Sequence, residues 1–473
     1  MEYFSDFLVW LGSLTWICAD SGRYTVYADL ILKDFSWLHT GDYENGPYRT
    51  TFGNMPGYPL LIALCKFLCG ETGWRGGVFL SQLLMLCISA YALHRLAQAL
   101  RFKPWVRRLF LFAYFTGLPF YFTTLILTDS IFASLGIISV CLISLVFVRK
   151  RVSLLQGSLL FLCLTLLCFW RESGTPFVIS ILFLLMFFCF QKRWMDFLKI
   201  SGICLAVLCG TQATVRCWNV HRIGVPLFSS NLMHTMTGVL YGIESENPGA
   251  FRHMSIKDYG SEVRKEMERQ RDLGYVRYGG DLGRVFRKKK DVEGIDPHTL
   301  QSLVLKDIAG MWLLHPWSAT WLVLSNPRLS GLFLYSALWS PSGLVGLRWQ
   351  KANNEVPKDF LPEWISVVLE ILSDVLSLLV LLRLCACAVN LARKGNFPSL
   401  SLLCEKSNAL FLGIFLQSIA YVFSYLVIIN WVEYRYVLPS IVFIGFLGMW
   451  TVNDLLDFCR TPLSKNHENP VGN

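Results

Sequence analysis

The sequence predicts an all-α protein that crosses a membrane many times. The 473-residue chain is 54% hydrophobic with a mean hydropathy of +0.46, which is more apolar surface than a soluble core of this size buries. Only 16% of the residues are charged, and they gather in short runs between apolar stretches, as the cost of placing unpaired charge in hydrocarbon requires. A soluble enzyme is therefore not expected. Nor is nucleic acid expected as a partner, because no basic stripe with interleaved aromatic residues is present.

Ten stretches have roughly the 17 to 25 apolar residues that a membrane-spanning helix needs. They are Phe4 to Ala19, Gly77 to Gln98, Trp105 to Leu127, Ser130 to Val148, Leu154 to Trp170, Thr175 to Phe190, Leu198 to Trp218, Trp364 to Leu391, Ala409 to Ile429 and Val437 to Asp457. The first stretch lacks the basic start and the small-residue cleavage site of a signal peptide, so we expect it to remain as a helix.

Two further apolar segments are interrupted. Pro59 to Cys69 is too short to span and is followed by Gly70, which predicts an amphipathic helix at the membrane interface. Ile308 to Leu347 is broken by three prolines, so it forms either interfacial helices or an extra pair of spans. We therefore expect a bundle of about 10 to 12 transmembrane helices with an amphipathic first outer loop and a long outer loop.

The basic residues predict the orientation of this bundle, because short loops rich in lysine and arginine stay in the cytoplasm. Four such clusters are present: Arg101, Lys103, Arg107 and Arg108; Arg149, Lys150 and Arg151; Lys192, Arg193 and Lys199; Arg393 and Lys394. The long loop with the basic run Arg287 to Lys290 is placed outside, since long translocated loops are exempt from the rule.

The chain thus divides into four parts. We expect a transmembrane module at 1–218 with its first outer loop at 20–76, an extracytoplasmic loop with interfacial helices at 219–362, further transmembrane helices at 363–460 and a cytoplasmic tail at 461–473. A multi-pass protein of a plasma (inner) membrane follows from this organisation.

Polar residues suited to catalysis gather at the predicted outer ends of the helices. They are Asp20 and Tyr24 after the first span, the Pro56-Gly57-Tyr58-Pro59 turn, Thr128-Asp129, Trp170-Arg171-Glu172, and Glu433-Tyr434-Arg435-Tyr436 before the last span. Their common side of the membrane predicts a site on the extracytoplasmic face.

This order of motifs resembles the GT-C superfamily of membrane glycosyltransferases, and within it the branch of the protein O-mannosyltransferases and the lipid A aminoarabinose transferase. The resemblance covers roughly the first 220 and the last 60 residues. It implies inverting transfer of a sugar from a polyprenyl-phosphate donor to a protein, lipid or glycan acceptor. Many relatives have a basic residue before the proline-rich turn, whereas Asn54 and Met55 stand there in this chain. Phosphate contact then falls to Arg49 or to the later arginines.

The chemistry assigns a role to each residue type. A carboxylate must take the proton of the acceptor hydroxyl, and Asp20 is the candidate general base. The departing lipid phosphate needs donors that hold its charge, for which Arg49, Arg171 and Arg435 are the candidates. Asp129 or Glu172 is a candidate for holding the acceptor, orienting an arginine or contributing to a divalent metal site. No cofactor is otherwise expected, and the metal is left open.

Each of these residues also has a structural interpretation. Asp20 is also suited to capping a helix, Arg171 to pairing locally with Glu172, and Arg435 to reaching the lipid headgroups. Tyr24, Pro56, Gly57 and Tyr58 are expected to shape the outer loop more than to touch substrate.

Two other functions stay open at this point. One is an O-antigen polymerase or ligase, which would use a large basic late loop such as the one after Asn219. The other is a transporter or flippase of a lipid-linked substrate, which would need polar residues at mid-membrane and a repeat between halves. Loss of sugar transfer on Asp20→Asn, with normal expression, is expected only of the glycosyltransferase.

Overall fold

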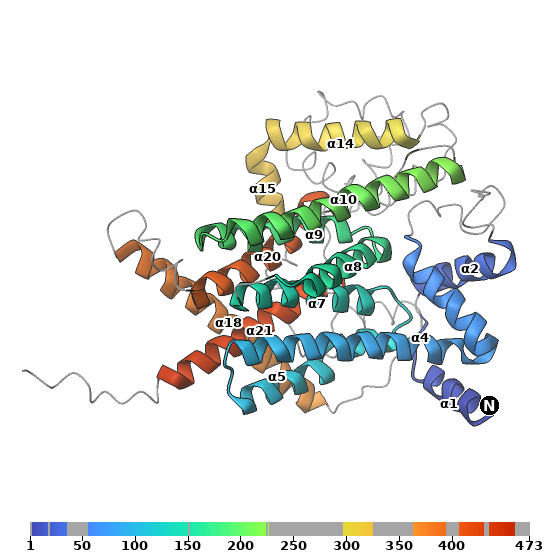
Figure 1. The fold of residues 1–473 in the computed structure, drawn as a ribbon, viewed down its shortest axis with the longest axis horizontal. Helices are drawn as coiled ribbons and strands as arrows, with labels where there is room; N and C mark the ends of the chain where they lie inside the picture. Colours follow the sequence, from blue (N-terminus) through green and yellow to red (C-terminus); the bar gives the residue numbers. More distant parts are fainter. Residues whose placement is uncertain are drawn as a thin grey trace, which may run out of the picture.

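The computed structural model describes residues 2–17, 19–35, 55–149, 152–223, 226, 297–324, 363–393, 406–429 and 435–458. In these residues all regular structure is helical, apart from an isolated bridge between Trp16 and Leu125. Figure 1 shows the long helices of the bundle lying roughly alongside one another. The all-α class predicted from the sequence is thereby confirmed for the described residues.

The helices are α1 (Glu2–Ser13), α2 (Ala19–Asp34), α4 (Gly57–Ala99), α5 (Pro104–Thr116), α6 (Leu118–Thr124), α7 (Asp129–Arg149), α8 (Leu154–Trp170), α9 (Gly174–Phe190), α10 (Trp194–Ile223), α14 (Pro297–Leu314), α15 (Pro316–Leu324), α18 (Glu363–Arg393), α20 (Lys406–Ile429) and α21 (Leu438–Phe458). Among the described residues, five helices are long and apolar enough to cross a membrane, namely α4, α7, α10, α20 and α21, while α8 and α9 are shorter apolar helices. The total of 10 to 12 spans stays a prediction.

Most of the predicted spans agree with the helices. The seven helices α7, α8, α9, α10, α18, α20 and α21 each coincide with an expected stretch to within a few residues at either end. The reason is that each of these apolar runs ends in polar or basic residues. For α8 the start is also capped by Ser153, whose hydroxyl accepts from the backbone of Gln156.

The prediction of one helix from Phe4 to Ala19 is wrong. Helix α1 ends at Ser13, and α2 begins at Ala19. Between them the backbone of Trp16 is bonded to a distant segment: its N–H donates to the carbonyl of Thr124 (2.9 Å) and its carbonyl accepts from Ile126 (3.0 Å). Arg75 donates to the side chain and carbonyl of Thr15, which holds the chain out of the helix. Local composition contains no sign of these long-range bonds.

The prediction of one span from Trp105 to Leu127 is also wrong. Helix α5 ends at Thr116, α6 is a single short helix from Leu118, and the chain is extended at Leu125. Gly117 has an extended backbone (φ −100°, ψ −161°), and Pro119 stands in the first turn of α6. Proline lacks the N–H that a continuous helix would use, so a new helix starts here.

Helix α4 contains the break that the sequence suggested after Cys69. Gly70 has φ 71° and ψ 175°, a conformation that glycine adopts without strain and that a helix interior excludes. Figure 1 shows the parts of α4 before and after the break running in different directions. The short apolar helix from Pro59 to Cys69 is therefore a separate piece, set at an angle to the predicted span.

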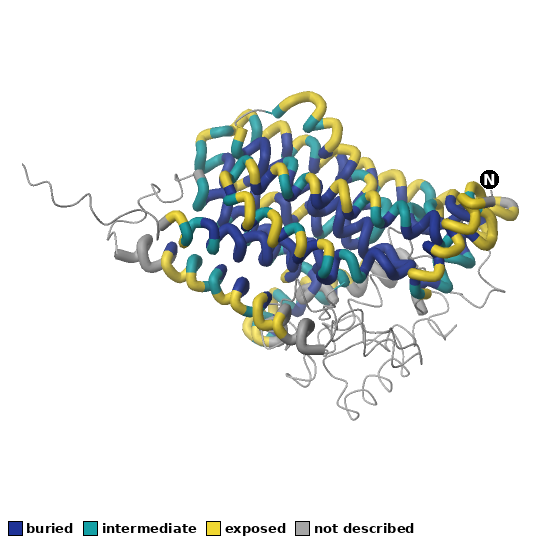
Figure 2. Tube along the Cα trace, turned by 90° about the horizontal axis from the view of Figure 1, so that it is seen from below, coloured by how far each residue is buried: buried dark blue, intermediate teal, exposed yellow. Residues whose placement is uncertain are grey.

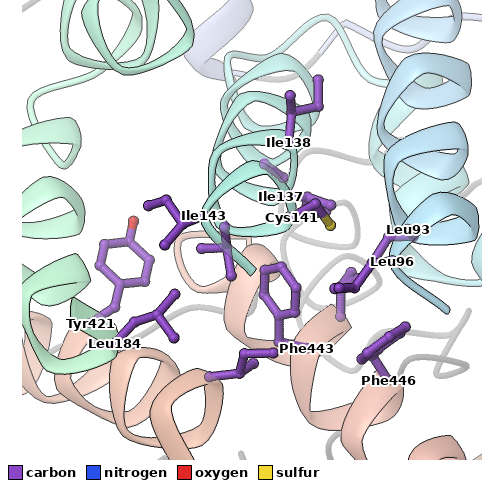
Figure 3. Packing of buried hydrophobic residues seen from close by; sticks show 14 of the residues in the cluster. Leu93, Leu96, Ile137, Ile138, Cys141, Ile143, Leu184, Tyr421, Phe443 and Phe446 are labelled. Carbon is purple, nitrogen blue, oxygen red and sulfur yellow. The ribbon is translucent and has the colours of Figure 1, made fainter. Parts of the chain in front are cut away.

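Helix α7 is the centre of the bundle, and nearly all of its residues are buried. It packs between α4, α8 and α21. Figure 3 shows part of this core, with residues from five helices: Ile137, Ile138, Cys141 and Ile143 of α7, Leu93 and Leu96 of α4, Leu184 of α9, Tyr421 of α20, and Phe443 and Phe446 of α21. Because α7 is packed against other helices along its whole length, the residues at its two ends are held in defined positions.

The outer faces of the helices are apolar. In Figure 2 the buried residues follow the inner faces of the long helices, and the exposed ones lie mostly on the outside. Large apolar side chains such as Leu84, Phe112 and Leu205 are exposed there. Such a surface is costly in water and suited to lipid, so the packing agrees with the predicted membrane location.

Residues of the predicted cytoplasmic loops lie at one end of the bundle. The ammonium group of Lys103 pairs with Asp457 (2.7 Å), near the C-terminal end of α21. Arg193 donates to the carbonyls of Phe147 (2.7 Å) and Val146 (3.1 Å), near the C-terminal end of α7. The N-terminal ends of α7 and α21 lie at the opposite end, where the polar residues of the predicted outer face are found.

Candidate functional site

An ion pair joins the start of α7 to the end of α8. Asp129 is the first residue of α7, and its side chain is 1% exposed. Arg171 directly follows α8, and its guanidinium donates to the Asp129 carboxylate and, at 3.5 Å, to the hydroxyl of Thr128. A carboxylate is favoured at a helix N-terminus by the helix dipole, and a buried charge persists only when it is paired. The pair therefore fixes the position of the Arg171 guanidinium.

Arg171 remains charged in this setting. Burial lowers its pKa, but the negative charge of Asp129 and the nearby tyrosines Tyr425, Tyr436 and Tyr24 raise it by more, so that the net pKa lies above the ordinary value for arginine. The site thus contains a permanent, oriented cation.

Arg435 converges on the same place from another part of the chain. The guanidinium carbon of Arg171 lies 4.4 Å from the centre of the Tyr436 ring, and that of Arg435 lies 4.8 Å from the same ring. Arg435 also donates to the Tyr436 hydroxyl at 2.8 Å. An aromatic ring attracts a cation over its face, so the Tyr436 ring is a common partner of both guanidinium groups.

Two tyrosines of α20 support the Tyr436 ring. Tyr425 stacks on it with ring centres 5.6 Å apart and planes 5° apart. The hydroxyl of Tyr421 donates to the Tyr436 carbonyl at 3.0 Å. The sequence analysis assigned no role to these residues, since two aromatic residues four positions apart in a span look like ordinary core. One feature could have pointed to them: both carry a hydroxyl group, and they lie toward the predicted outer end of α20.

The Pro56 to Pro59 turn packs on the end of α8. Tyr58 is fully buried, and its ring lies edge-on to Tyr24 (5.2 Å) and to Trp170 (6.1 Å). A Cβ on Gly57 would lie 2.7 Å from the Trp170 ring, so only glycine allows this close approach. The turn thus contacts the residue directly before Arg171. The structural role expected of Tyr24, Pro56, Gly57 and Tyr58 stays a prediction.

Asp20 is the second residue of α2, where the sequence had placed it after the end of the first span. Its side chain lies outside the described residues. The neighbouring Ser21 donates through its hydroxyl to the carbonyl of Ile126 at 2.7 Å, which anchors the start of α2 three residues before Asp129 in the chain. The role of Asp20 as general base stays a prediction, and the structure locates only the backbone that bears it.

The other predicted residues differ in how much the structure says of them. Arg49, Glu433 and Tyr434 lie outside the described residues. Glu172 is half-buried in the turn between α8 and α9. Among the residues described, no group of three or more histidine, cysteine, aspartate or glutamate side chains is arranged to hold a metal ion. The question of a divalent metal therefore stays open.

The comparisons with known proteins give one likeness. No protein-family model and no curated protein matches the sequence. Among solved structures, the chain is similar to the crystal structure of ArnT from Cupriavidus metallidurans in the apo state, with 13% sequence identity, a TM-score of 0.32, and coverage of 95% of this chain and 76% of that one. A likeness this distant supports no statement about this chain.

Proposed function

We propose that this chain is a GT-C type membrane glycosyltransferase that transfers a sugar from a polyprenyl-phosphate donor to an acceptor at the extracytoplasmic face. The observation that supports this best is the convergence of Arg171 and Arg435 on Tyr436, at the end of the bundle opposite the basic loops. Two fixed cations at the end of membrane-spanning helices suit a ligand with a phosphate headgroup and a lipid tail.

The two arginines would bind the phosphate that leaves the sugar. Arg171 uses one of its terminal nitrogens for Asp129, and its planar fork offers further N–H groups to a phosphate oxygen. Arg435, which donates to the Tyr436 hydroxyl, would bring a second guanidinium group to the same phosphate. Donors that are already oriented stabilise the developing negative charge without reorganisation when the bond to the sugar breaks.

Asp129 is assigned to orienting Arg171 and not to proton transfer. Its carboxylate is buried and accepts from the Arg171 guanidinium, which suits it to holding that cation in place. Asp20 is the remaining candidate for the general base, at the start of α2 and therefore beside the segment that leads to Asp129. In an inverting reaction it would accept the proton of the acceptor hydroxyl as that oxygen attacks the anomeric carbon.

The substrates would arrive by different routes. The donor's lipid tail would stay in the bilayer, and its headgroup would reach the arginines laterally. The acceptor, whether protein, lipid or glycan, would approach from the extracytoplasmic side. The enzyme would then work in a plasma (inner) membrane with other membrane lipids around its apolar outer faces, and no nucleotide would take part.

The test is transfer by the purified protein in lipid nanodiscs. Polyprenyl-phosphate mannose and polyprenyl-phosphate aminoarabinose are suitable donors to try first, and release of polyprenyl phosphate is the readout. We expect release by the wild-type chain and loss of release by Arg171→Ala. Arg95→Ala is the matched control. Arg95 also donates to a tyrosine hydroxyl (Tyr91, 3.0 Å), but it is exposed and lies near the C-terminal end of α4, away from the candidate site. Movement of intact donor across the membrane without bond cleavage would favour a flippase instead.

A further inference from the structure

A buried glutamine in the middle of α4 joins two segments that lead to the site. The side chain of Gln82 is fully buried. Its amide nitrogen donates to the carbonyls of Thr123 (2.8 Å) and Leu125 (2.9 Å), and its amide oxygen accepts from the Tyr58 hydroxyl (3.3 Å). Only an amide has two donors for two carbonyls and an acceptor for a hydroxyl at its other side. The three partners therefore specify both the residue type and its orientation.

The two carbonyls lie in the short segment from Thr123, in the last turn of α6, to Leu125, which caps that helix. The last carbonyls of a helix have no partner within it. In a dry bundle such groups are costly unless another group donates to them. The same segment pairs with Trp16 on its other side and continues within a few residues to Asp129. Gln82 thus holds in place the chain that positions the carboxylate of the ion pair.

The Tyr58 hydroxyl belongs to the proline-rich turn. Its ring contacts Trp170, and Trp170 directly precedes Arg171. The Gln82 side chain is therefore linked to both partners of the Asp129–Arg171 pair. It is linked to Asp129 through Leu125, and to Arg171 through Tyr58 and Trp170. The sequence analysis did not single out Gln82, because a lone glutamine in a span has no motif.

We infer that Gln82 is a positioning residue of the reaction, which sets the spacing between the proline-rich turn and the segment that leads to Asp129. This inference rests on the proposed glycosyltransferase function. Gln82 itself touches neither donor nor acceptor. Its removal would leave both arginines and Asp20 in the chain but would let the two segments move relative to each other.

A second hydrogen bond on α4 provides the control. The hydroxyl of Tyr114 is bonded to that of Ser89 at 2.7 Å, and both side chains are fully buried. Tyr58→Phe and Tyr114→Phe thus each remove one buried tyrosine hydroxyl that is bonded to α4. Only the first of these hydroxyls is connected to the site.

The experiment combines kinetics with hydrogen–deuterium exchange on the full-length protein in nanodiscs, for Gln82→Leu, Tyr58→Phe, their double variant and Tyr114→Phe. We expect the turnover of Gln82→Leu to fall by roughly ten- to a hundredfold, because small displacements of catalytic groups cost this much. The donor KM should change by less than about threefold, since both arginines remain. The double variant should be no slower than Gln82→Leu, because the bond between Tyr58 and Gln82 that Tyr58→Phe breaks is already lost in Gln82→Leu.

The exchange data separate this inference from the proposed function. Faster exchange at residues 57–62 and 124–130 in Gln82→Leu, and not in Tyr114→Phe, would establish the link even if no sugar transfer were found. Wild-type exchange and turnover in Gln82→Leu would overturn the inference and leave the glycosyltransferase proposal standing. Equal loss of turnover in Tyr114→Phe would also overturn it, since any buried bond would then have the same effect.

Discussion

The guanidinium of Arg171 donates to the carboxylate of Asp129, so the end of α8 is bonded to the start of the neighbouring helix α7. Both side chains are largely buried, and Tyr436, two residues before α21, covers Arg171 with its ring. Three helix ends are thereby joined through one charged group.

Removing one partner of the ion pair should destabilise the protein more than removing both. Arg171→Ala would leave the Asp129 charge buried and unpaired, which costs about 3 to 5 kcal/mol in comparable cases. We expect a clear drop in the thermal unfolding temperature for Arg171→Ala in detergent. The double variant Asp129→Asn with Arg171→Ala should recover part of that drop while remaining inactive. If the single and double variants unfold at the same temperature, the pair is not what holds these helix ends.

Tyr436 should contribute to donor binding through its ring and its hydroxyl separately. Tyr436→Phe keeps the ring over Arg171 but removes the acceptor for Arg435, and a lost hydrogen bond to a charged group is worth about 1.5 to 3 kcal/mol. We expect the donor KM to rise by about tenfold or more, with Tyr436→Ala worse than Tyr436→Phe. Titration of donor in the release assay measures this. An unchanged KM in Tyr436→Phe would mean that the Arg435 contact is irrelevant to the donor.

Gly57→Ala should impair activity through Trp170. The added methyl group would lie 2.7 Å from the Trp170 ring, and a contact this short forces neighbouring groups to move. Because Arg171 is the next residue, we expect turnover to fall by at least about tenfold. Gly210→Ala is the matched control, since nothing lies within 4 Å of the Cβ position there. Equal activities of the two variants would argue against the contact between the turn and α8.

Asp20→Asn should abolish proton transfer without disturbing the fold. Replacement of a general base typically costs about 10² to 10⁴ in turnover, whereas asparagine keeps the size of aspartate. Asp20→Ser also lacks the carboxylate and should be equally inactive. Both variants should express and unfold as the wild type does. A variant that stays active would show that Asp20 is not the general base.

The spans that the sequence predicted best are those whose ends are set by local chemistry. The run from Leu154 to Trp170 is mostly apolar, begins after a capping serine and ends before Arg171, so local residues determine where the helix starts and stops. The break after Ser13 was missed for the opposite reason, because it depends on how Thr124 to Ile126 lies against Trp16, which is distant in sequence. The break after Thr116 had a local signal in Gly117 and Pro119, which the uninterrupted apolar composition of the stretch outweighed in the sequence analysis.

The site was predictable in part. Asp129, Arg171 and Arg435 were singled out because charged residues at the ends of apolar runs are costly and therefore conspicuous. The approach of both arginines to Tyr436 was not predictable, since it depends on how α7, α8 and α21 pack. The tyrosines of α20 and the amide of Gln82 were missed because neutral polar groups in a span give no pattern that separates support from ordinary core packing.

The most direct measurement of the central claim is a cryo-EM map of the protein with a bound polyprenyl-phosphate sugar. We predict that the phosphate density contacts the guanidinium groups of Arg171 and Arg435, with the lipid tail along the outer face of the bundle and the sugar facing the start of α2. Phosphate density at the opposite end, beside Lys103 and Arg193, would contradict the account.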